Sequence, residues 1–198
     1  MRTPARASRV AGAIRKVKLL VCDVDGVLTD GRIVYDSGGR ELRFFDVQDG
    51  LAVRLLRTAG IKTVLVSFKA SHAIKYRAKD MAVEEFYAGV FPKQKLLPGL
   101  LKTHRVDKDE ICYVGDDLVD LGMMKIVGFP VAVANACPEV KAVARYVTRK
   151  PGGRGAVREV VELILKTQGK WDEVVEAVYG TPPANARSRK RSPRGGRG

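Results

Sequence analysis

Short, almost wholly apolar segments that alternate with longer helical patterns constrain this chain more than any other feature of its sequence. Val, Ile and Leu dominate the short segments, and continuous rather than alternating hydrophobicity is typical of strands covered on both faces. We expect strands at 18–23, 62–66, 84–87, 111–114, 129–133 and 145–148. We expect helices between them at 50–59, 71–81, 93–104, 118–127 and 138–143. The alternation predicts an α/β fold with an open, doubly wound parallel sheet.

One insertion breaks the alternation between the first strand and the first helix. Two β-type runs, 32–35 and 41–45, flank the turn-forming sequence DSGG, so we expect a protruding hairpin there. After the last strand, a glycine-rich loop at 150–155 leads to two further helix patterns, 156–167 and 171–178.

Basic residues gather at the two ends of the chain. The 36 Lys and Arg against 22 Asp and Glu give a formal charge of +14, a balance typical of nucleic-acid-binding proteins. Twelve of the basic residues lie in 1–18 and 184–198, which hold no acidic residue, and the other 165 residues carry 24 basic and 22 acidic side chains. We expect a basic N-terminal tail, 1–17, a near-neutral folded domain, 18–180, and a disordered basic tail, 181–198. Nucleic-acid binding by the tails is an alternative that we do not favour, because they lack interleaved aromatic residues.

The sequence also bounds the setting of the protein. No apolar run approaches the roughly 18 to 20 residues of a membrane-spanning helix, and the N-terminus lacks the apolar core of a secretory signal. We therefore expect a cytoplasmic protein without a membrane span. Cys22, Cys112 and Cys137 are odd in number and widely spaced, and two of them lie in apolar runs. This usage is typical of structural thiols rather than of a disulfide or zinc site.

Carboxylates follow two of the predicted strands. Asp23 and Asp25 end the first strand, and Asp116, Asp117 and Asp120 follow the fourth. Ligands of open α/β sheets bind at the carboxyl ends of the strands. Several negative charges placed together there need a compensating cation. Oxygen ligands without histidine or thiolate favour Mg²⁺, which often takes a substrate phosphate as a further ligand.

Several longer motifs accompany these carboxylates. DVDGVLTDG closes the first strand, GDDLVD closes another about 90 residues later, and FDVQDGLAVRLL, CYVGDDLVD and YVTRKPGGRGAVREV are less common stretches. With them the chain, over about 18–170, resembles the haloacid dehalogenase superfamily of phosphatases. Within it, the resemblance is to the capless branch that hydrolyses 3-deoxy-D-manno-octulosonate 8-phosphate, a lipopolysaccharide precursor. The resemblance implies a Rossmann-like sheet with the hairpin in place of a cap domain, Mg²⁺ as cofactor, a small phosphorylated sugar acid as substrate, and a homotetramer.

The resemblance also implies roles for the acidic residues. Asp23 would be the nucleophile that forms an aspartyl-phosphate, and Asp25 would be the general acid and then the base for the hydrolytic water. Mg²⁺ would be held by the Asp23 carboxylate, the Asp25 main-chain carbonyl and Asp116, with Asp120 or Asp117 in support. Two easier steps would replace one difficult displacement.

Two further residues would complete the phosphate site. Ser67 matches the hydroxyl donor of the superfamily, and Lys93 matches its cationic partner of the phosphoryl oxygens. Lys95 is the alternative if the alignment is shifted by two residues. Without the acidic pair, a Ser after a strand is typical of a helix cap and a Lys is typical of the solvated surface.

The resemblance places the sugar pocket on the segment after the hairpin. Its expected lining, apart from Asp25 and Lys93, is Asp46, Val47, Gln48, Asp49, Gly50, Arg54 and Lys69. Arg77 would reach the substrate carboxylate, and Arg154 would approach the site of an adjacent subunit. Guanidinium groups suit a substrate with both carboxylate and phosphate. The alternative for Asp46 and Asp49 is capping of the helix that starts near Gly50.

One stretch departs from the branch. Ser67 is followed by Phe68 and Lys69, where the branch has Gly and Arg. Phe adds bulk beside the ligand, and Lys keeps the charge but loses the bidentate fork. The departure leaves open the alternative of a phosphatase for another sugar or nonulosonate phosphate. The basic tails leave open a second alternative, a basic-tailed nucleic-acid-binding scaffold on a phosphatase fold.

Overall fold

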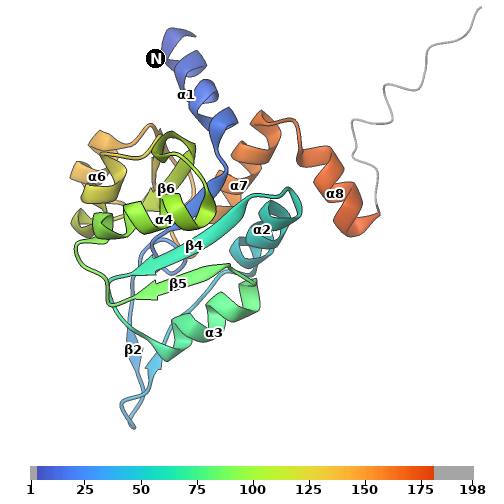
Figure 1. Cartoon of the computed structure of the whole chain (residues 1–198). Coiled ribbons are helices and arrows are strands. Elements are labelled where there is room, and N and C mark those ends of the chain that lie inside the picture. The colour runs from blue at the N-terminus through green and yellow to red at the C-terminus, as the bar shows by residue number, and fades with distance from the viewer. Residues whose placement is uncertain (1–3, 181–198) are drawn as a thin grey trace, which may run out of the picture.

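A single sheet of six parallel strands, with helices on both faces, organises the molecule (Figure 1). The computed structural model describes residues 4–180. The strand order is β5-β4-β1-β6-β7-β8. The strands are β1 (Leu19–Cys22), β4 (Lys62–Ser67), β5 (Glu85–Ala88), β6 (Ile111–Gly115), β7 (Phe129–Ala132) and β8 (Tyr146–Val147). The predicted α/β class and the six predicted strands are confirmed, with ends that differ by at most one residue.

Helices cover the two faces as the doubly wound prediction requires. On one face α2 (Val47–Thr58) packs against α7 (Ala156–Thr167), with α3 (His72–Met81) and α8 (Trp171–Tyr179) beside it. The other face carries α4 (Leu97–His104) and α6 (Pro138–Val143). Helix α5 (Leu121–Met124) packs against α6 and against the 3₁₀ turns η1 (Lys93–Leu96) and η3 (Leu118–Asp120), whereas the turn η2 (Lys108–Glu110) contacts α1. All four residues of β1 are buried, because helices cover the sheet on both sides.

The N-terminal segment differs from the expected tail. Residues Pro4–Lys16 form helix α1, which packs against α7. Ile14 and Val17 are buried, and the side-chain amide of Gln168 donates to the carbonyls of both, at 3.2 and 2.8 Å. The count of charged residues does not indicate that this segment packs on the domain, because its apolar residues lie among basic ones. The predicted tail at 181–198 lies outside the described residues. Within residues 4–180, no helix is long and apolar enough to cross a membrane.

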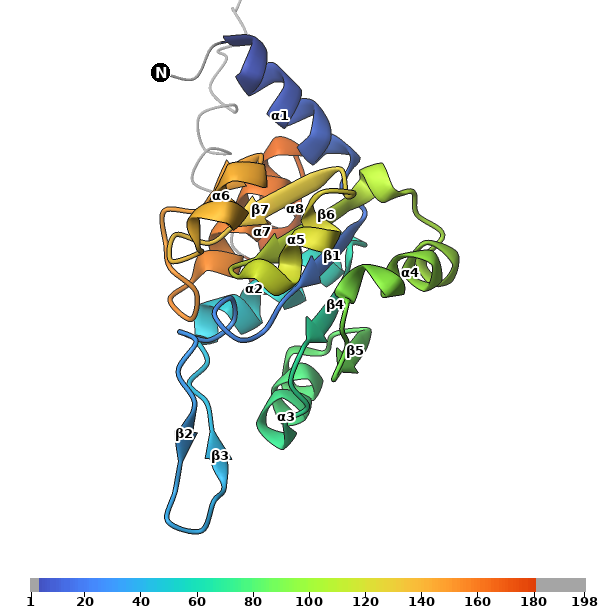
Figure 2. The ribbon, with the colours of Figure 1, turned by 90° about the vertical axis from the view of Figure 1, so that its left-hand side faces the viewer.

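The insertion after β1 is a hairpin that projects from the body of the molecule (Figure 2). Its strands, β2 (Val34–Tyr35) and β3 (Glu41–Leu42), pair in antiparallel fashion. The Asp36 carboxylate closes the turn by accepting from the backbone N–H groups of Gly38 and Arg40. The predicted hairpin is therefore present, with shorter strands than expected.

The sheet topology brings two strand ends together. β1 lies between β4 and β6, so the chain order reverses at β1, and open α/β sheets bind their ligands at such a point, beyond the carboxyl ends of the strands. The N–H of Asp23 donates to the carbonyl of Val114 at 3.0 Å and extends the pairing of the two strands. The acidic segments that follow β1 and β6 consequently face each other.

Candidate active site

A buried lysine joins the two acidic segments. Nζ of Lys93 lies 2.7 Å from Oδ1 of Asp23 and 2.7 Å from Oδ1 of Asp120. Lys93 and Asp120 are fully buried, and Asp23 is 5% exposed. Burial alone would lower the pKa of Lys93, but the two carboxylates raise it, so the side chain is a cation. The alternative residue, Lys95, is exposed.

Asp120 is held from every side by the protein. Its Oδ1 also accepts from the Tyr113 hydroxyl at 2.7 Å, and its Oδ2 accepts from the backbone N–H groups of Asp116 and Asp117 at 2.9 and 3.3 Å. Asp117 instead is exposed and caps η3 through the N–H of Leu118. The geometry thus separates the two candidates for the supporting acidic residue: Asp120 belongs to the buried cluster, and Asp117 lies outside it.

Three carboxylates form a group that fits a divalent cation. Asp23, Asp116 and Asp120 each offer an oxygen within 4.8 Å of the others. Oδ1 of Asp116 is buried and has no hydrogen-bond partner among residues 4–180. Burial, and next the charge of Asp23, raise the pKa of Asp116. Three ionised carboxylates and one ammonium leave two negative charges uncompensated, and oxygen-only ligands suit a hard divalent ion such as Mg²⁺.

Gly26 makes room for Asp116. The residue has a φ of +86°, and a Cβ atom there would overlap the Asp116 carboxylate. We expect Gly26→Ala to displace that carboxylate, to raise the Mg²⁺ concentration for half-maximal activity, and to cost about 1–2 kcal/mol of stability through backbone strain. Gly60→Ala is the matched control, because Gly60 has a φ of +76° and open space around it. A Mg²⁺ titration should be shifted by the first substitution only; equal titrations for both would contradict the role of Gly26.

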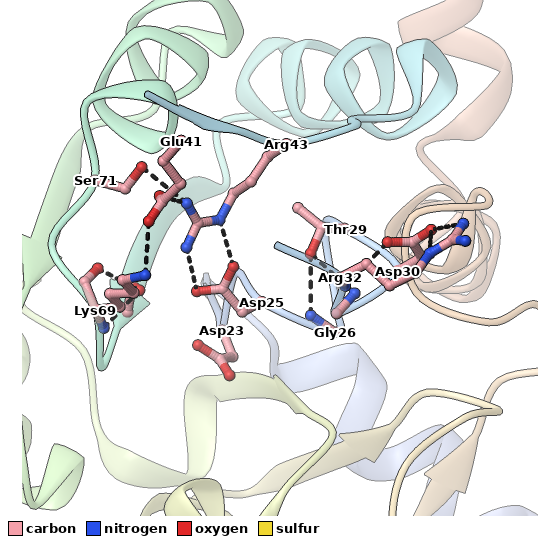
Figure 3. A network of polar contacts seen from close by, with 12 residues as sticks. Asp23, Asp25, Gly26, Thr29, Asp30, Arg32, Glu41, Arg43, Lys69 and Ser71 are labelled. Atoms are coloured by element: carbon pink, nitrogen blue, oxygen red, sulfur yellow. Dashed lines mark hydrogen bonds and ion pairs between the residues drawn. The ribbon is translucent and has the colours of Figure 1, made fainter. Parts of the chain in front are cut away.

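Asp25 is held by the hairpin (Figure 3). The guanidinium of Arg43, which follows β3, makes two contacts with this carboxylate: Nε to Oδ1 at 2.6 Å and Nη2 to Oδ2 at 3.2 Å. Asp25 therefore does not share the cation of Asp23. The two acidic residues of the first motif have separate partners, as different chemical roles require.

Ser67 and Lys69 lie at the end of the neighbouring strand, β4. The Ser67 hydroxyl is buried and bonds to the backbone of Lys69, donating to its carbonyl at 2.7 Å and accepting from its N–H at 3.1 Å. Nζ of Lys69 lies 2.7 Å from Glu41 and 2.8 Å from the Tyr35 hydroxyl, both in the hairpin. Both residues are next to β1, but their polar atoms are engaged within the protein.

Comparisons with known proteins agree with this geometry. Residues 67–160 match the model of the haloacid dehalogenase-like hydrolase family. Over 156 residues the chain is 42% identical to the 3-deoxy-D-manno-octulosonate 8-phosphate phosphatase of Yersinia pestis, which covers 79% of this chain and 83% of the relative. The same enzyme of Escherichia coli K12 is 40% identical over 170 residues, 86% of this chain and 90% of the relative. This chain is a haloacid dehalogenase-like hydrolase.

The hydrolase is also similar to a solved structure of the same kind of phosphatase. The Moraxella catarrhalis 3-deoxy-D-manno-octulosonate 8-phosphate phosphatase, in complex with magnesium, phosphate and a KDO molecule, aligns with a TM-score of 0.83 and 38% identity. The alignment covers 86% of this chain and 98% of that one. The resemblance drawn from the sequence motifs is confirmed.

Some of the residues predicted for the sugar pocket line a cavity between the segment after β1, the segment after the hairpin and the glycine-rich loop. The cavity has a volume of about 520 Å³, and Asp46, Val47 and Arg154 line it together with Asp30, Arg32, Phe44, Phe45 and Gly153. The glycine-rich loop reaches this position because its backbone packs directly on the segment after β1. A Cβ at Gly152 would overlap the carbonyl of Gly26. Arg154 thus faces Asp46 and Val47 within one chain.

Other residues predicted for the pocket have partners inside the hydrolase. Asp46 caps α2 through the N–H of Gln48, which is the alternative role that the sequence predicts for it. Asp49 does not cap that helix: it is buried and accepts from the N–H groups of Gly155 and Arg158 at the start of α7. Burial raises its pKa to about 6. The side-chain oxygen of Gln48 accepts from Lys150 at 3.3 Å.

Two of the three predicted arginines of the hydrolase, Arg54 on α2 and Arg77 on α3, contact other parts of the fold. Arg54 donates to the carbonyl of Asp80 at 2.6 Å. Arg77 donates to the Asp80 carboxylate and to the Asp46 carbonyl, each at 2.7 Å, and its guanidinium fills the space that a side chain at Gly50 would need. Arg77 therefore braces the start of α2, and Gly50 is required for that contact. Neither arginine lines the cavity that Arg154 shares.

Sequence reasoning missed two residues of the site, Arg43 and Tyr113. Tyr113 lies within an apolar strand, where an aromatic residue reads as core, and only its contact with Asp120 reveals a polar role. Arg43 stands between Leu42 and Phe44. The one signal in the sequence was a basic residue between two apolar residues of a predicted strand. Side chains alternate along a strand, so Arg43 is expected on the opposite face from Leu42 and Phe44.

Proposed function

We propose that this hydrolase is a Mg²⁺-dependent phosphomonoesterase that releases phosphate from 3-deoxy-D-manno-octulosonate 8-phosphate. One observation carries the proposal: the buried contact of Lys93 with Asp23, beside the unpartnered oxygen of Asp116. This arrangement gives a nucleophilic carboxylate, a cation for phosphoryl oxygens and a place for a metal. The sugar acid in the Moraxella catarrhalis complex and the names of the curated relatives support the substrate.

The chemistry assigns one carboxylate to each task. A carboxylate oxygen of Asp23 forms a bond to phosphorus as the bond from phosphorus to the sugar oxygen breaks, and Asp25 gives its proton to that oxygen. The free sugar acid leaves. Asp25, now a carboxylate, takes a proton from a water molecule that attacks phosphorus, and the bond from phosphorus to Asp23 breaks. Phosphate is released and both carboxylates return to their first state.

The cation would be held by chain atoms that the fold already brings together. Asp23, Asp116 and the Asp25 carbonyl would be its ligands. Asp120, with its oxygens already used by four donors, would orient Lys93 and the loop after β6. Bound Mg²⁺ would screen the repulsion between the nucleophile and the phosphate and stabilise the negative charge of the transition state.

The proposal is tested by measuring phosphate release from 3-deoxy-D-manno-octulosonate 8-phosphate with Mg²⁺ and after treatment with a chelator. We expect turnover with Mg²⁺, loss of at least about 100-fold on chelation, and full recovery when Mg²⁺ is restored in excess. Unchanged turnover after chelation would contradict the metal site. No turnover in either condition would contradict the substrate.

The hairpin supports the predicted homotetramer. Its apolar side chains are exposed in the single chain: Ile33, Val34, Tyr35, Leu42 and Phe44. Such a row is typical of a contact between proteins. Light scattering that reports a monomer would contradict this part of the proposal. A cytoplasmic location, consistent with a small phosphorylated sugar acid as substrate, belongs to the same proposal.

A further inference from the structure

The hairpin reaches the acid-base residue through one buried cation. The guanidinium of Arg43 grips both oxygens of Asp25 and donates through Nη1 to the hydroxyl of Ser71 at 2.9 Å (Figure 3). Nη1 is also paired with Glu41. The Arg43 side chain has no exposed surface. A buried guanidinium whose three nitrogens all have partners holds those partners in fixed positions, whereas a surface ion pair contributes little to the structure.

This network ties three segments of the chain together. Asp25 lies in the loop after β1, Arg43 and Glu41 belong to the hairpin, and Ser71 immediately precedes α3. Glu41 in turn holds Lys69 at 2.7 Å, at the end of β4. The position of the hairpin therefore determines where the Arg43 guanidinium stands, and the guanidinium determines how the Asp25 carboxylate is turned.

Only the contact with Arg43 fixes the orientation of the Asp25 carboxylate in the part of the chain that the structure describes. Among residues 4–180, Arg43 alone makes a hydrogen bond or ion pair with its carboxylate. Asp23 is different, because Lys93 holds it. A two-point contact fixes the plane of a carboxylate, which a single hydrogen bond does not. Proton transfer depends on that orientation, since the donor oxygen must lie within hydrogen-bond reach of the leaving oxygen.

We propose that Arg43 is a positioning residue that orients Asp25 for proton transfer, so that the hairpin controls the acid-base step of the reaction. The inference rests on the proposed function. When Asp25 gives its proton to the sugar oxygen, the carboxylate that remains regains both arms of the guanidinium, which stabilises the product of that transfer. Arg43 itself forms no bond with the reacting atoms.

The test compares two esters in the same enzyme preparation. The sugar oxygen of 3-deoxy-D-manno-octulosonate 8-phosphate needs a proton to leave, whereas the nitrophenolate of p-nitrophenyl phosphate leaves as an anion. We expect Arg43→Gln to lower kcat/KM about 100-fold for the sugar phosphate and less than about fivefold for the aryl ester. Asp25→Asn should show the same selective loss, and Arg43→Lys should restore part of it. Arg40→Ala, which removes an exposed hairpin cation paired with Asp36, should leave both constants unchanged.

The ratio of the two constants does not depend on how much of a variant is folded, because both come from one preparation. Equal losses for the two esters in Arg43→Gln would overturn the inference and show that the residue is merely structural. Wild-type constants in Arg43→Gln would overturn it as well. A wild-type enzyme that hydrolyses neither ester would instead contradict the proposed function on which the inference rests.

Discussion

Replacing Asp23 by Asn is expected to abolish turnover, with a loss on the order of 10⁴-fold or more, as for the nucleophile of other enzymes that form covalent intermediates. The amide has the shape of the carboxylate and can accept from Lys93, but it cannot form the bond to phosphorus. Burial, and next repulsion by Asp120, raise the pKa of Asp23, so the ionised carboxylate costs the fold free energy. A neutral amide removes that cost. The midpoint of thermal unfolding without Mg²⁺ should therefore not fall.

Phosphate release and thermal unfolding, measured on the same preparation, check this prediction. Asp172→Asn is the matched control, because it makes the same chemical change at an exposed position at the start of α8 and should leave both measurements unchanged. Substantial turnover by Asp23→Asn would contradict the assignment of the nucleophile. A protein that loses activity only because it no longer folds would show a lower unfolding midpoint.

Lys93→Met should have the largest effect on stability. The substitution leaves Asp23 and Asp120 buried without their shared cation, and breaking a buried ion pair in this way typically costs about 3–5 kcal/mol. Saturating Mg²⁺ should recover part of this stability, because a divalent cation compensates the same carboxylates. Turnover should stay at least about 100-fold below that of the wild type, since the phosphoryl oxygens lose their cation.

Urea unfolding with and without Mg²⁺ measures the stability change, and phosphate release measures turnover. Lys95→Met removes an exposed lysine two residues away and serves as the control, with no expected effect on either measurement. Wild-type stability and turnover in Lys93→Met would refute the role given to this buried cation.

The positions of the carboxylates could be predicted because strand ends are a property of local sequence. Apolar runs stop at Asp23 and at Asp116, and a parallel sheet aligns its carboxyl ends, so pattern alone brings these residues to one edge. Lys93 needed the resemblance to a known family, since nothing in its own surroundings separates it from a solvated lysine. The helix formed by the N-terminal segment was hidden by its basic charge.

The remaining side chains depend on long-range packing that one sequence does not encode in its local pattern. Asp49 looks like a cap for its own helix, yet it caps α7, more than 100 residues later in the chain. Arg77, for which the resemblance implies a role in substrate binding, donates to the Asp46 carbonyl, a contact that its own sequence surroundings do not indicate. Arg43 reaches Asp25 only because the hairpin folds back over the loop after β1. Long charged side chains have several partners within reach, and tertiary structure selects among them.

The same long-range contacts bear on substrate choice. Lys69 stands where the branch has an arginine, and it is paired with Glu41 and Tyr35 of the hairpin. Phe68, which replaces a glycine, is largely exposed and meets Phe91 edge to face at 5.8 Å. A substrate carboxylate would compete with Glu41 for Lys69. The rate of hydrolysis of the octulosonate ester should therefore be compared with the rates for other sugar phosphates.

The most direct measurement is kcat/KM for a panel of phosphate esters in the presence of Mg²⁺. The panel contains 3-deoxy-D-manno-octulosonate 8-phosphate, a nine-carbon nonulosonate 9-phosphate and simple hexose phosphates. We expect the octulosonate ester to exceed every other member by at least about tenfold, a margin of 1.4 kcal/mol in transition-state stabilisation. Equal or faster hydrolysis of the nonulosonate or hexose esters would contradict the proposed substrate and would indicate that this hydrolase acts on another sugar phosphate.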